Sequence, residues 1–345
     1  MSQDKALTKQ RLSELWQSPK IPVLDLHANK YVIISDVHLG DGGDADDLHH
    51  NENALLTALD HYNHEGYSLI LLGDIEEFWQ FDLDKIKSRY HDTVYKSIRA
   101  FGDDRVYRVF GNHDSEWRGF PDPAKNAPAK HVGAAEALKM KDEQGNLRIL
   151  LVHGHHGSTE SDKNSWFSRF WVRVYRKVEP LIKFDPHTEA TKSQIMKDYE
   201  QILYSWAKES KVMLICGHSH RAIFASKSYT DRLEDKIAEL QAEIYANRTN
   251  VDLVKRNIKE IGRLLKKSLQ EKLKGRDIDP TEADGEPLPC YFNTGCALYT
   301  DGITDIEIGD DKIKLVKWDR DASKDPRFEI YQQGVLSSFI AQVTG

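Results

Sequence analysis

The pattern that most constrains the fold is a mainly apolar run that ends in polar, metal-ligating residue types, and it occurs five times. The runs cover residues 31–35, 68–72, 105–110, 148–152 and 211–216. Such runs, rich in β-branched residues, are typical of strands that are buried on both faces. Segments with helical periodicity, such as 51–64 and 84–100, separate several of the runs. The sequence therefore predicts βαβ units in an α/β fold.

The polar residues that follow the runs form one chemical set. Ligand sites of open α/β sheets lie at the carboxyl ends of the strands, and side chains two residues apart on a strand point to the same side. The set contains carboxylates, imidazoles and one amide: Asp36, His38, Asp74, Asn112, His153, His218 and His220. Any one of these alone would more often be a structural residue, but five ordered clusters at strand ends favour a common metal site.

The chemistry of this set indicates which metals would bind. Mixed carboxylate, imidazole and amide ligands suit Mn²⁺, Fe or Zn²⁺ better than Ca²⁺. Seven ligands exceed the needs of one ion, whereas two ions about 3.5–4 Å apart would use them all, with one carboxylate bridging. We therefore expect a centre of two divalent ions, with Mn²⁺ as the leading candidate.

The overall composition argues against several classes of protein. The 345 residues carry a net charge of -7, which is unusual for a protein that coats nucleic acid. Residues 1–20 are polar, and no run approaches the ~20 apolar residues that span a bilayer. Three cysteines (Cys216, Cys290 and Cys296) do not suggest a disulfide framework. We expect a cytoplasmic protein, with peripheral membrane contact left open.

The C-terminal part of the chain predicts further strands. Cys290–Thr294 is a strand-like run, and residues 303–308 and 312–318 flank Gly309-Asp310-Asp311, which is typical of a hairpin turn. We expect these strands to form a second, partly antiparallel sheet that packs on the first.

A segment at residues 165–190 does not belong to the strand pattern. Within it, residues 165–178 predict a strongly amphipathic helix with an aromatic, apolar face and a basic face (Arg169, Arg173, Arg176 and Lys177). Such helices commonly lie on membrane surfaces. A helix packed on the core, a lid over the substrate and a membrane-facing helix are the alternatives.

A second unusual segment covers residues 229–275. Two sets of apolar residues recur at three-four spacing: Leu233, Ile237, Leu240 and Ile244, and then Val254, Ile258, Ile261 and Leu265. This pattern predicts an antiparallel coiled-coil hairpin, and the mainly acidic first helix would pair with the mainly basic second helix. The hairpin is either a solvated structural arm or a surface for homodimerisation or partner docking.

Together, the strand-end motifs resemble those of the calcineurin-like metallophosphoesterases, in that family's order and over roughly residues 30 to 300. They are Asp36-x-His38, Gly73-Asp74, Gly111-Asn112-His113-Asp114, His153 and Gly217-His218-x-His220. The resemblance implies a single domain over residues 1–345, folded as a four-layer α-β-β-α sandwich with the two segments above as insertions.

The resemblance also implies a role for each site residue. Asp36, His38 and His220 would hold the first ion with Asp74, which would bridge, and Asn112, His153 and His218 would complete the second ion. A hydroxide between the ions would attack phosphorus. His113 would be the general acid that protonates the leaving oxygen, with Asp114 orienting it.

Three residues are candidates for contacting the substrate. Asn112 would do so beside the metals, His155 would touch the phosphate and Arg221 would bind an anionic group. The alternatives are a supporting role near the metals or a merely solvated position for His155, and a surface position for Arg221.

The substrate is predicted only as a class. We expect a phosphodiester or a pyrophosphate, because His113 can protonate a poor alkoxide leaving group. A phosphomonoesterase, a nuclease and a non-catalytic partner-binding scaffold are alternatives, although the net charge makes a nucleic-acid substrate the less favoured one. Residues 73–79 and 217–221 resemble the branch of UDP-2,3-diacylglucosamine pyrophosphate hydrolases, but His113 replaces an arginine common there and His155 replaces an aspartate.

Overall fold

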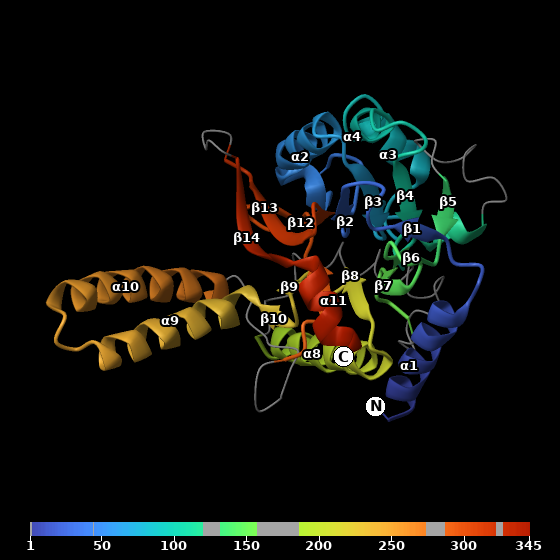
Figure 1. Cartoon of the computed structure of the whole chain (residues 1–345). Coiled ribbons are helices and arrows are strands. Elements are labelled where there is room, and N and C mark those ends of the chain that lie inside the picture. Colours follow the sequence, from blue (N-terminus) through green and yellow to red (C-terminus); the bar gives the residue numbers. More distant parts are fainter. Residues whose placement is uncertain (1, 44, 120–131, 157–185, 274–286, 322–326) are drawn as a thin grey trace.

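A computed structural model describes the whole chain except residues 1, 44, 120–131, 157–185, 274–286 and 322–326. The described part is a mixed α/β structure with two seven-stranded sheets and eight α-helices (Figure 1). The predicted amphipathic helix at 165–178 lies outside the described residues. Within the described ranges, no helix is long and apolar enough to cross a bilayer.

The first sheet combines parallel and antiparallel strands. Its order is β14 (Phe328–Val335), β13 (Lys312–Asp319), β12 (Gly302–Gly309), β2 (Tyr31–Ile34), β3 (Ser68–Leu72), β4 (Val106–Val109) and β5 (Val132–Ala135). Strands β2 to β5 pair in parallel, so their carboxyl ends meet at one edge.

The second sheet contains the other strands. Its order is β1 (Val23–Asp25), β6 (Ala137–Lys141), β7 (Leu147–Val152), β8 (Met213–Cys216), β11 (Tyr291–Thr294), β9 (Ala222–Phe224) and β10 (Lys227–Ser228). Strands β7, β8 and β11 are parallel, which again brings their carboxyl ends together.

The predicted division of strands between the sheets is wrong. The C-terminal hairpin extends the first sheet, because β12 pairs with the edge of β2, while β7 and β8 belong to the second sheet. The hairpin itself is confirmed, and Asp310 and Asp311 have φ angles of 52° and 54°, as a type I′ turn requires. An apolar run predicts a strand but not the strand that pairs with it, so the sequence pattern could not predict this pairing.

Strand β2 shows how the two sheets share a core. Tyr31 and Ile33 pack with residues of the second sheet such as Leu214, whereas Val32 and Ile34 pack on the opposite side, under the helices. All four side chains are buried, as the uncharged run predicts.

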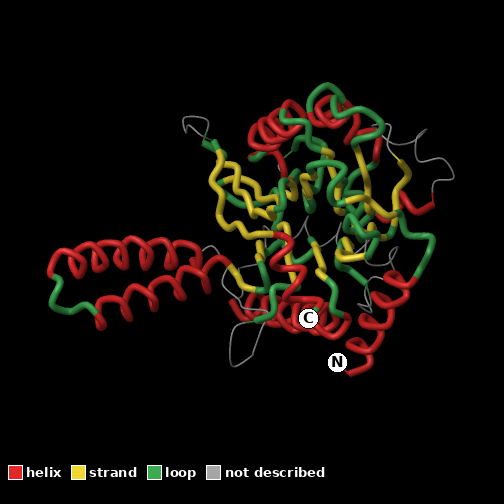
Figure 2. Tube along the Cα trace, viewed as in Figure 1, coloured by secondary structure: helices red, strands yellow, loops and turns green. Residues whose placement is uncertain are grey.

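Helices lie on the outer side of each sheet. Helices α2 (Glu52–His64), α3 (Leu83–Tyr90) and α4 (Val94–Arg99) lie by the first sheet, and α1 (Ser2–Gln17) and α8 (Pro186–Ser210) lie by the second (Figure 2). Helix α11 (Leu336–Thr344) follows β14, and the short 3-10 helices are η1 (Asp47–His50) and η2 (Ser115–Gly119).

The prediction of one continuous helix over residues 84–100 is wrong. The segment forms two helices, α3 and α4, and each of them directs one tyrosine hydroxyl to a buried carboxylate. Tyr90 bonds Asp46 at 2.6 Å, and Tyr95 bonds Glu76 at 3.2 Å. Both rings are buried, although a continuous helix would place residues five positions apart about 140° from each other around its axis.

Helices α9 (Tyr229–Ala246) and α10 (Val251–Leu273) run side by side and stand out from the body (Figure 1). Leu233, Ile237 and Leu240 are buried against Leu264, as their spacing predicts for the first helix. The predicted contact face of α10 is partly wrong, because Ile258 and Leu265 are 58% and 54% exposed. Helix α10 is turned so that Asn257 is buried instead, and its side chain donates to Glu243 at 2.8 Å.

Candidate metal centre

The polar strand ends of both sheets meet at one side of the molecule. Three backbone amides after β2 donate to carbonyls after β3: Asp36 to Gly73 at 3.1 Å, and Val37 and His38 to Asp74 at 2.9 and 3.0 Å. The amide of His218, which follows β8, donates to the Asp36 carboxylate at 2.9 Å. These bonds tie loops that are far apart in sequence into one cluster.

The backbone at this cluster adopts an unusual conformation. Five of the predicted ligands have φ angles in the left-handed region: Asp36 (53°), His38 (50°), Asp74 (53°), His218 (68°) and His220 (56°). Non-glycine residues rarely occupy this region, and clusters of them are typical of functional sites, where surrounding contacts maintain the strain. The strain therefore marks the same residues that the strand-end pattern selects.

Two glycines make the close packing of these loops possible. A Cβ atom on Gly111 would lie 2.1 Å from an oxygen of Asp74, and one on Gly73 would lie 2.5 Å from the His153 ring. Any larger residue at either position would displace a predicted ligand.

The predicted ligands fall into groups with the spacing of metal sites. Asp36, His38 and His220 form one group and Asp74, His153 and His218 form another, with the candidate ligand atoms of each group within 4.8 Å of one another. Oδ1 of Asp36 lies 3.1 Å from Nε2 of His220, and Oδ2 of Asp74 lies 2.9 Å from Nε2 of His153. The structure thus brings six of the seven predicted ligands into two adjacent groups.

Two buried atoms test whether these residues suit a metal ion. The Nε2 atom of His38 and the Oδ1 atom of Asn112 are both buried and have no hydrogen-bond partner among the described residues. Leaving such atoms unpaired is costly, so each is expected to face a ligand. Both are the atoms that would coordinate a cation, and the donor set as a whole therefore fits divalent metal ions.

The other nitrogens of two imidazoles are held by the protein. Nδ1 of His153 lies 2.9 Å from the carbonyl of Leu72 and so donates to it, which leaves Nε2 directed at Asp74. Nδ1 of His38 lies 2.8 Å from Glu77. Metal-binding histidines usually have their second nitrogen fixed in this way.

The carboxylates at the site are ionised, although they are buried. Burial opposes ionisation of Asp36, but the His220 and His153 imidazoles outweigh it and lower its pKa to about 2. Burial likewise opposes a charged His153, yet Asp74 and Asp36 raise its pKa to about 10. Burial and the neighbouring His153 lower the pKa of His218 to about 3, so that ring is neutral. The buried carboxylates stay ionised and attract positive charge.

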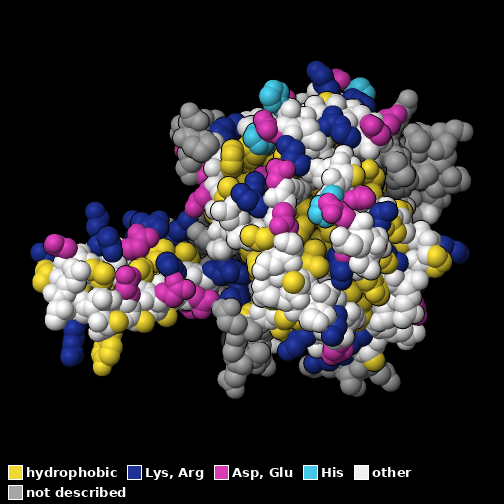
Figure 3. Space-filling view, in the orientation of Figure 1, with side chains coloured by type: hydrophobic (Ala, Val, Ile, Leu, Met, Phe, Trp, Pro, Cys, Tyr) yellow, Lys and Arg dark blue, Asp and Glu magenta, His cyan; other side chains and the backbone are white. Residues whose placement is uncertain are grey.

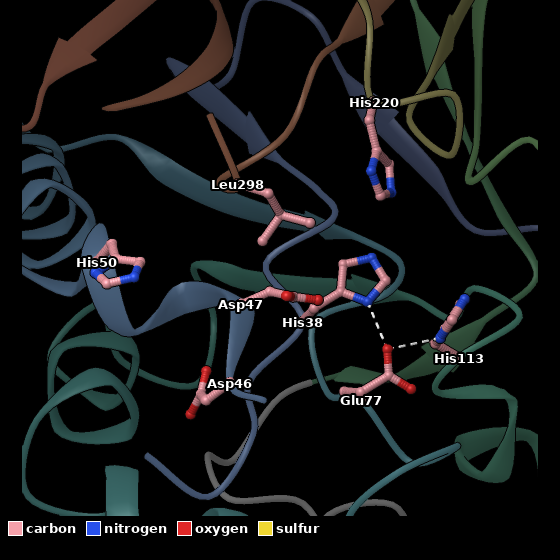
Figure 4. Close-up of a pocket in the computed structure, with 8 residues that line it drawn as sticks. All are labelled: His38, Asp46, Asp47, His50, Glu77, His113, His220 and Leu298. Carbon is pink, nitrogen blue, oxygen red and sulfur yellow. Dashed lines mark hydrogen bonds and ion pairs between the residues drawn. The ribbon is translucent and has the colours of Figure 1, made fainter. Parts of the chain in front are cut away.

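Glu77 is the site residue that sequence reasoning missed. One of its oxygens lies 2.8 Å from Nδ1 of both His38 and His113, and the carboxylate sits between the two rings (Figure 4). Burial raises the pKa of Glu77, but bonds from His113 and His38 prevail and hold it at about 2. The adjacent pair Glu76-Glu77 after Asp74 was visible in the sequence, but nothing there showed which of the two faces the site.

His113 is fixed by several contacts. Its ring stacks on Trp79, with centroids 4.0 Å apart, and its amide donates to Asp74 at 2.8 Å. Burial lowers the pKa of His113, whereas Asp74 and Glu77 raise it, and the net effect is upward. The ring is thus suited to carry a proton beside the metal groups.

Asp114 lies beneath the site rather than on His113. Its two oxygens accept from the amides of Gly111 at 2.6 Å and Ile75 at 2.9 Å. Burial, together with Asp74 and Glu76, raises its pKa to about 7. These contacts hold the loop that carries Asn112 and His113, whereas Glu77 contacts the His113 ring directly.

The candidate substrate contacts differ in position. His155 is buried and stacks on His156, with centroids 4.5 Å apart, and burial lowers its pKa well below the ordinary value. Arg221 is only 7% exposed and pairs with Glu200 of α8. Neither lines the cavity described next, so their contact with a substrate stays a prediction.

A cavity of about 490 Å³ opens beside the metal groups. It is lined by His38, Asp46, Asp47, His50, Glu77, His113, His220 and Leu298 (Figure 4). Asp46 itself is held by Tyr90 and by the amides of Gly42 and Leu48. The wall farther from His113 in Figure 4, formed by η1 and Leu298, was not predicted, because its residues lie several positions beyond the strand ends.

Comparison with known proteins gives one family. The family model of the calcineurin-like phosphoesterases matches residues 30–222, a range that contains every residue of the two metal groups. No curated protein matches the chain at a significant level.

Proposed function

Because the chain belongs to the calcineurin-like phosphoesterase family, we propose that it is a hydrolase of phosphoric esters that depends on two divalent metal ions. The observation that carries the proposal is the pair of buried, unpartnered atoms, His38 Nε2 and Asn112 Oδ1, within the clustered Asp and His residues. The family typically binds divalent metals. The identity of the ions is part of the proposal, with Mn²⁺ first and Fe or Zn²⁺ as alternatives.

The protein would hold the ions through its two groups of ligands. Asp36, His38 and His220 would hold one ion and His153 and His218 the other, while Asp74 would serve both and Asn112 would complete the set. When bound, two such ions polarise phosphate oxygens and lower the pKa of a water molecule toward neutrality.

The remaining chemistry belongs to His113. The leaving oxygen of a phosphoester needs a proton as the P–O bond breaks, and an imidazole beside the metals is placed to give it. Glu77 fixes Nδ1 of this ring at 2.8 Å, which leaves Nε2 to carry the mobile proton. Trp79 stacks on one face of the ring and limits its rotation. Glu77 also holds His38, so one carboxylate positions both the general acid and a metal ligand.

The lining of the cavity favours a phosphodiester. Asp46, Asp47 and Glu77 line it, whereas no lysine or arginine does so among the described residues. A second phosphate in this space would face carboxylates, which argues for a neutral or cationic substituent. A pyrophosphate, as in the UDP-2,3-diacylglucosamine hydrolase-like branch, is the second proposal, and a phosphomonoester is the third.

We further propose that the two sheets and their helices form a four-layer α-β-β-α arrangement and that α9 and α10 form a coiled coil. We also propose that the protein is cytoplasmic and makes peripheral membrane contact through residues 165–178. The last would be tested by sedimentation with anionic vesicles. Charge reversal at Arg169, Arg173 and Arg176 should abolish pelleting, and unchanged pelleting would exclude electrostatic attachment through this segment.

The central test combines metal removal with one substitution. Chelated protein should not hydrolyse bis-p-nitrophenyl phosphate, and Mn²⁺ should restore the activity. Asp74→Asn should prevent the recovery, whereas Asp41→Asn, an exposed residue of the neighbouring loop, should not. Turnover that survives both chelation and Asp74→Asn would disprove the proposal.

A further inference from the structure

Helix α10 exposes a row of large apolar side chains. Val251, Ile258, Leu265 and Leu269 are 60%, 58%, 54% and 59% exposed. Steps of seven, seven and four residues place them along one side of a helix. Together with Tyr245 at the tip of the arm, they are five of the nine large apolar side chains that are exposed in the described part of the chain. We call these four residues of α10 the apolar stripe.

The body of the protein does not cover this stripe. The arm projects away from the two sheets (Figures 1 and 2), and among the described residues it approaches them near its base. There, Lys267 pairs with Glu329 at 2.8 Å and Lys227 with Asp235 at 2.7 Å. The small core of the arm faces inward between its helices, so the apolar stripe lies on a different side of α10.

The step of seven residues has a physical meaning. Helices that pack along their length repeat their contact residues every 3.5 positions on average, and Val251, Ile258 and Leu265 have this spacing. Gly262 lies between Ile258 and Leu265, and a Cβ atom added to it would meet nothing within 4 Å. The stripe therefore has the spacing of a helix-packing surface and an open position at which a second helix could approach closely.

The charges beside the stripe indicate what would pack on it. Lys255, Lys259 and Lys266 make no ion pair with any described residue, and each lies within one helical turn of a residue of the stripe or of Gly262. Blue side chains are visible along the α10 edge of the arm in Figure 3. A partner helix with an acidic flank would complement this surface.

Helix α9 of a second copy has that charge. It carries five acidic and two basic residues over Tyr229–Ala246, whereas α10 carries seven basic and three acidic residues over Val251–Leu273. The arm is therefore complementary to itself, provided that α10 of one copy lies over α9 of the other. Stacking α10 on α10 would instead bring lysines together.

We propose that the arm is a homodimerisation surface in which the apolar stripe of each copy packs on the arm of the other, with α10 over α9. The inference rests on the arm alone and does not depend on the metal centre. A two-fold arrangement of this kind would bury both stripes and would bring the basic α10 of each copy against the acidic α9 of the other.

Sedimentation velocity over a concentration series of the full-length protein tests the proposal. Wild type should form a dimer, and Ile258→Glu with Leu265→Glu should weaken the dimer about 100-fold or more, because each stripe would then bury two charges. Leu7→Glu with Ile330→Glu is the matched control, since both residues are exposed elsewhere and about as apolar. It should dimerise as wild type does.

A second variant tests the charge argument. Replacing Lys255, Lys259 and Lys266 by glutamate should also dissociate the dimer, and the wild-type dimer should weaken as salt is raised. Far-UV circular dichroism should show an unchanged helix content in all variants. A wild type that stays monomeric at every concentration, or a dimer that both variants leave intact, would overturn the proposal.

Discussion

Glu77→Gln most directly tests whether one carboxylate positions both His38 and His113. Glu77 is 2% exposed, and its Oε2 atom lies 2.8 Å from Nδ1 of both His38 and His113. Its pKa of about 2 means that it is ionised throughout the neutral range. Glutamine has nearly the same shape, so the substitution removes the charge while it retains the packing.

The expected loss follows from the contacts. The glutamine oxygen can take the Oε2 position, but its NH₂ group then occupies the Oε1 position, which is buried and has no hydrogen-bond partner in the described structure. Both imidazoles would bond to a neutral oxygen instead of a charged one, which costs about 1 kcal/mol per bond. A total of about 2 kcal/mol corresponds to a drop of about 30-fold in kcat/KM.

The assay needs a substrate with a poor leaving group. An activated p-nitrophenyl ester requires little protonation, so kcat/KM should also be measured on an alkyl diester, with the metal content of each protein determined. The drop should be larger on the alkyl diester, because that substrate depends more on His113. A kcat/KM within about two-fold of wild type on both esters would refute the role of Glu77.

Asp114→Asn is the matched comparison. Since Asp114 binds the amides of Gly111 and Ile75, its replacement should lower the midpoint of urea unfolding more than it lowers kcat/KM per folded molecule. If Asp114→Asn inactivated the enzyme while Glu77→Gln did not, Asp114 would be the residue that orients His113, as the sequence resemblance implies.

Three further predictions concern stability, selectivity and metal binding. Burial and the nearby Glu307 raise the pKa of Asp305 well above its usual value, so the folded state retains a proton that the unfolded state releases. Stability should therefore fall as pH rises from about 4 toward the folded-state pKa, and Asp305→Asn should raise Tm more at pH 8 than at pH 4; an equal change at both would contradict this. Asp47→Lys should raise kcat/KM for p-nitrophenyl phosphate relative to bis-p-nitrophenyl phosphate, with Asp41→Lys as the control; an unchanged ratio would show that Asp47 does not select substrate charge. Mn²⁺ should raise the Tm of metal-free wild type but hardly that of Asp74→Asn, and equal shifts would place the ion elsewhere.

The sequence predicted the metal ligands best, because metal-binding residue types stand directly at the ends of predicted strands. Apolar runs predict strands, the carboxyl ends of parallel strands converge, and Asp36, His38 and Asp74 are the metal-binding types that stand there. The resemblance to the phosphoesterase family also depends on the order of these motifs along the chain. The set of ligands could therefore be predicted without knowing which strands pair.

The parts that sequence reasoning missed depend on three-dimensional packing. Glu77 is separated from His113 by 36 positions, and only the stacking of the loops reveals their contact. The pairing of β12 with β2 and the rotation of α10 around Asn257 depend on which faces are covered in the folded chain. Periodicity gives the type of an element, but not its neighbours.

The left-handed backbone conformation lowers the stability of the folded chain at five candidate metal ligands: Asp36, His38, Asp74, His218 and His220. Each such residue costs on the order of 1–3 kcal/mol, a cost that glycine would avoid. A chain with glycine at one of these positions would gain resistance to heat while losing a ligand. Selection for stability alone would therefore favour glycine first at these candidate ligand positions.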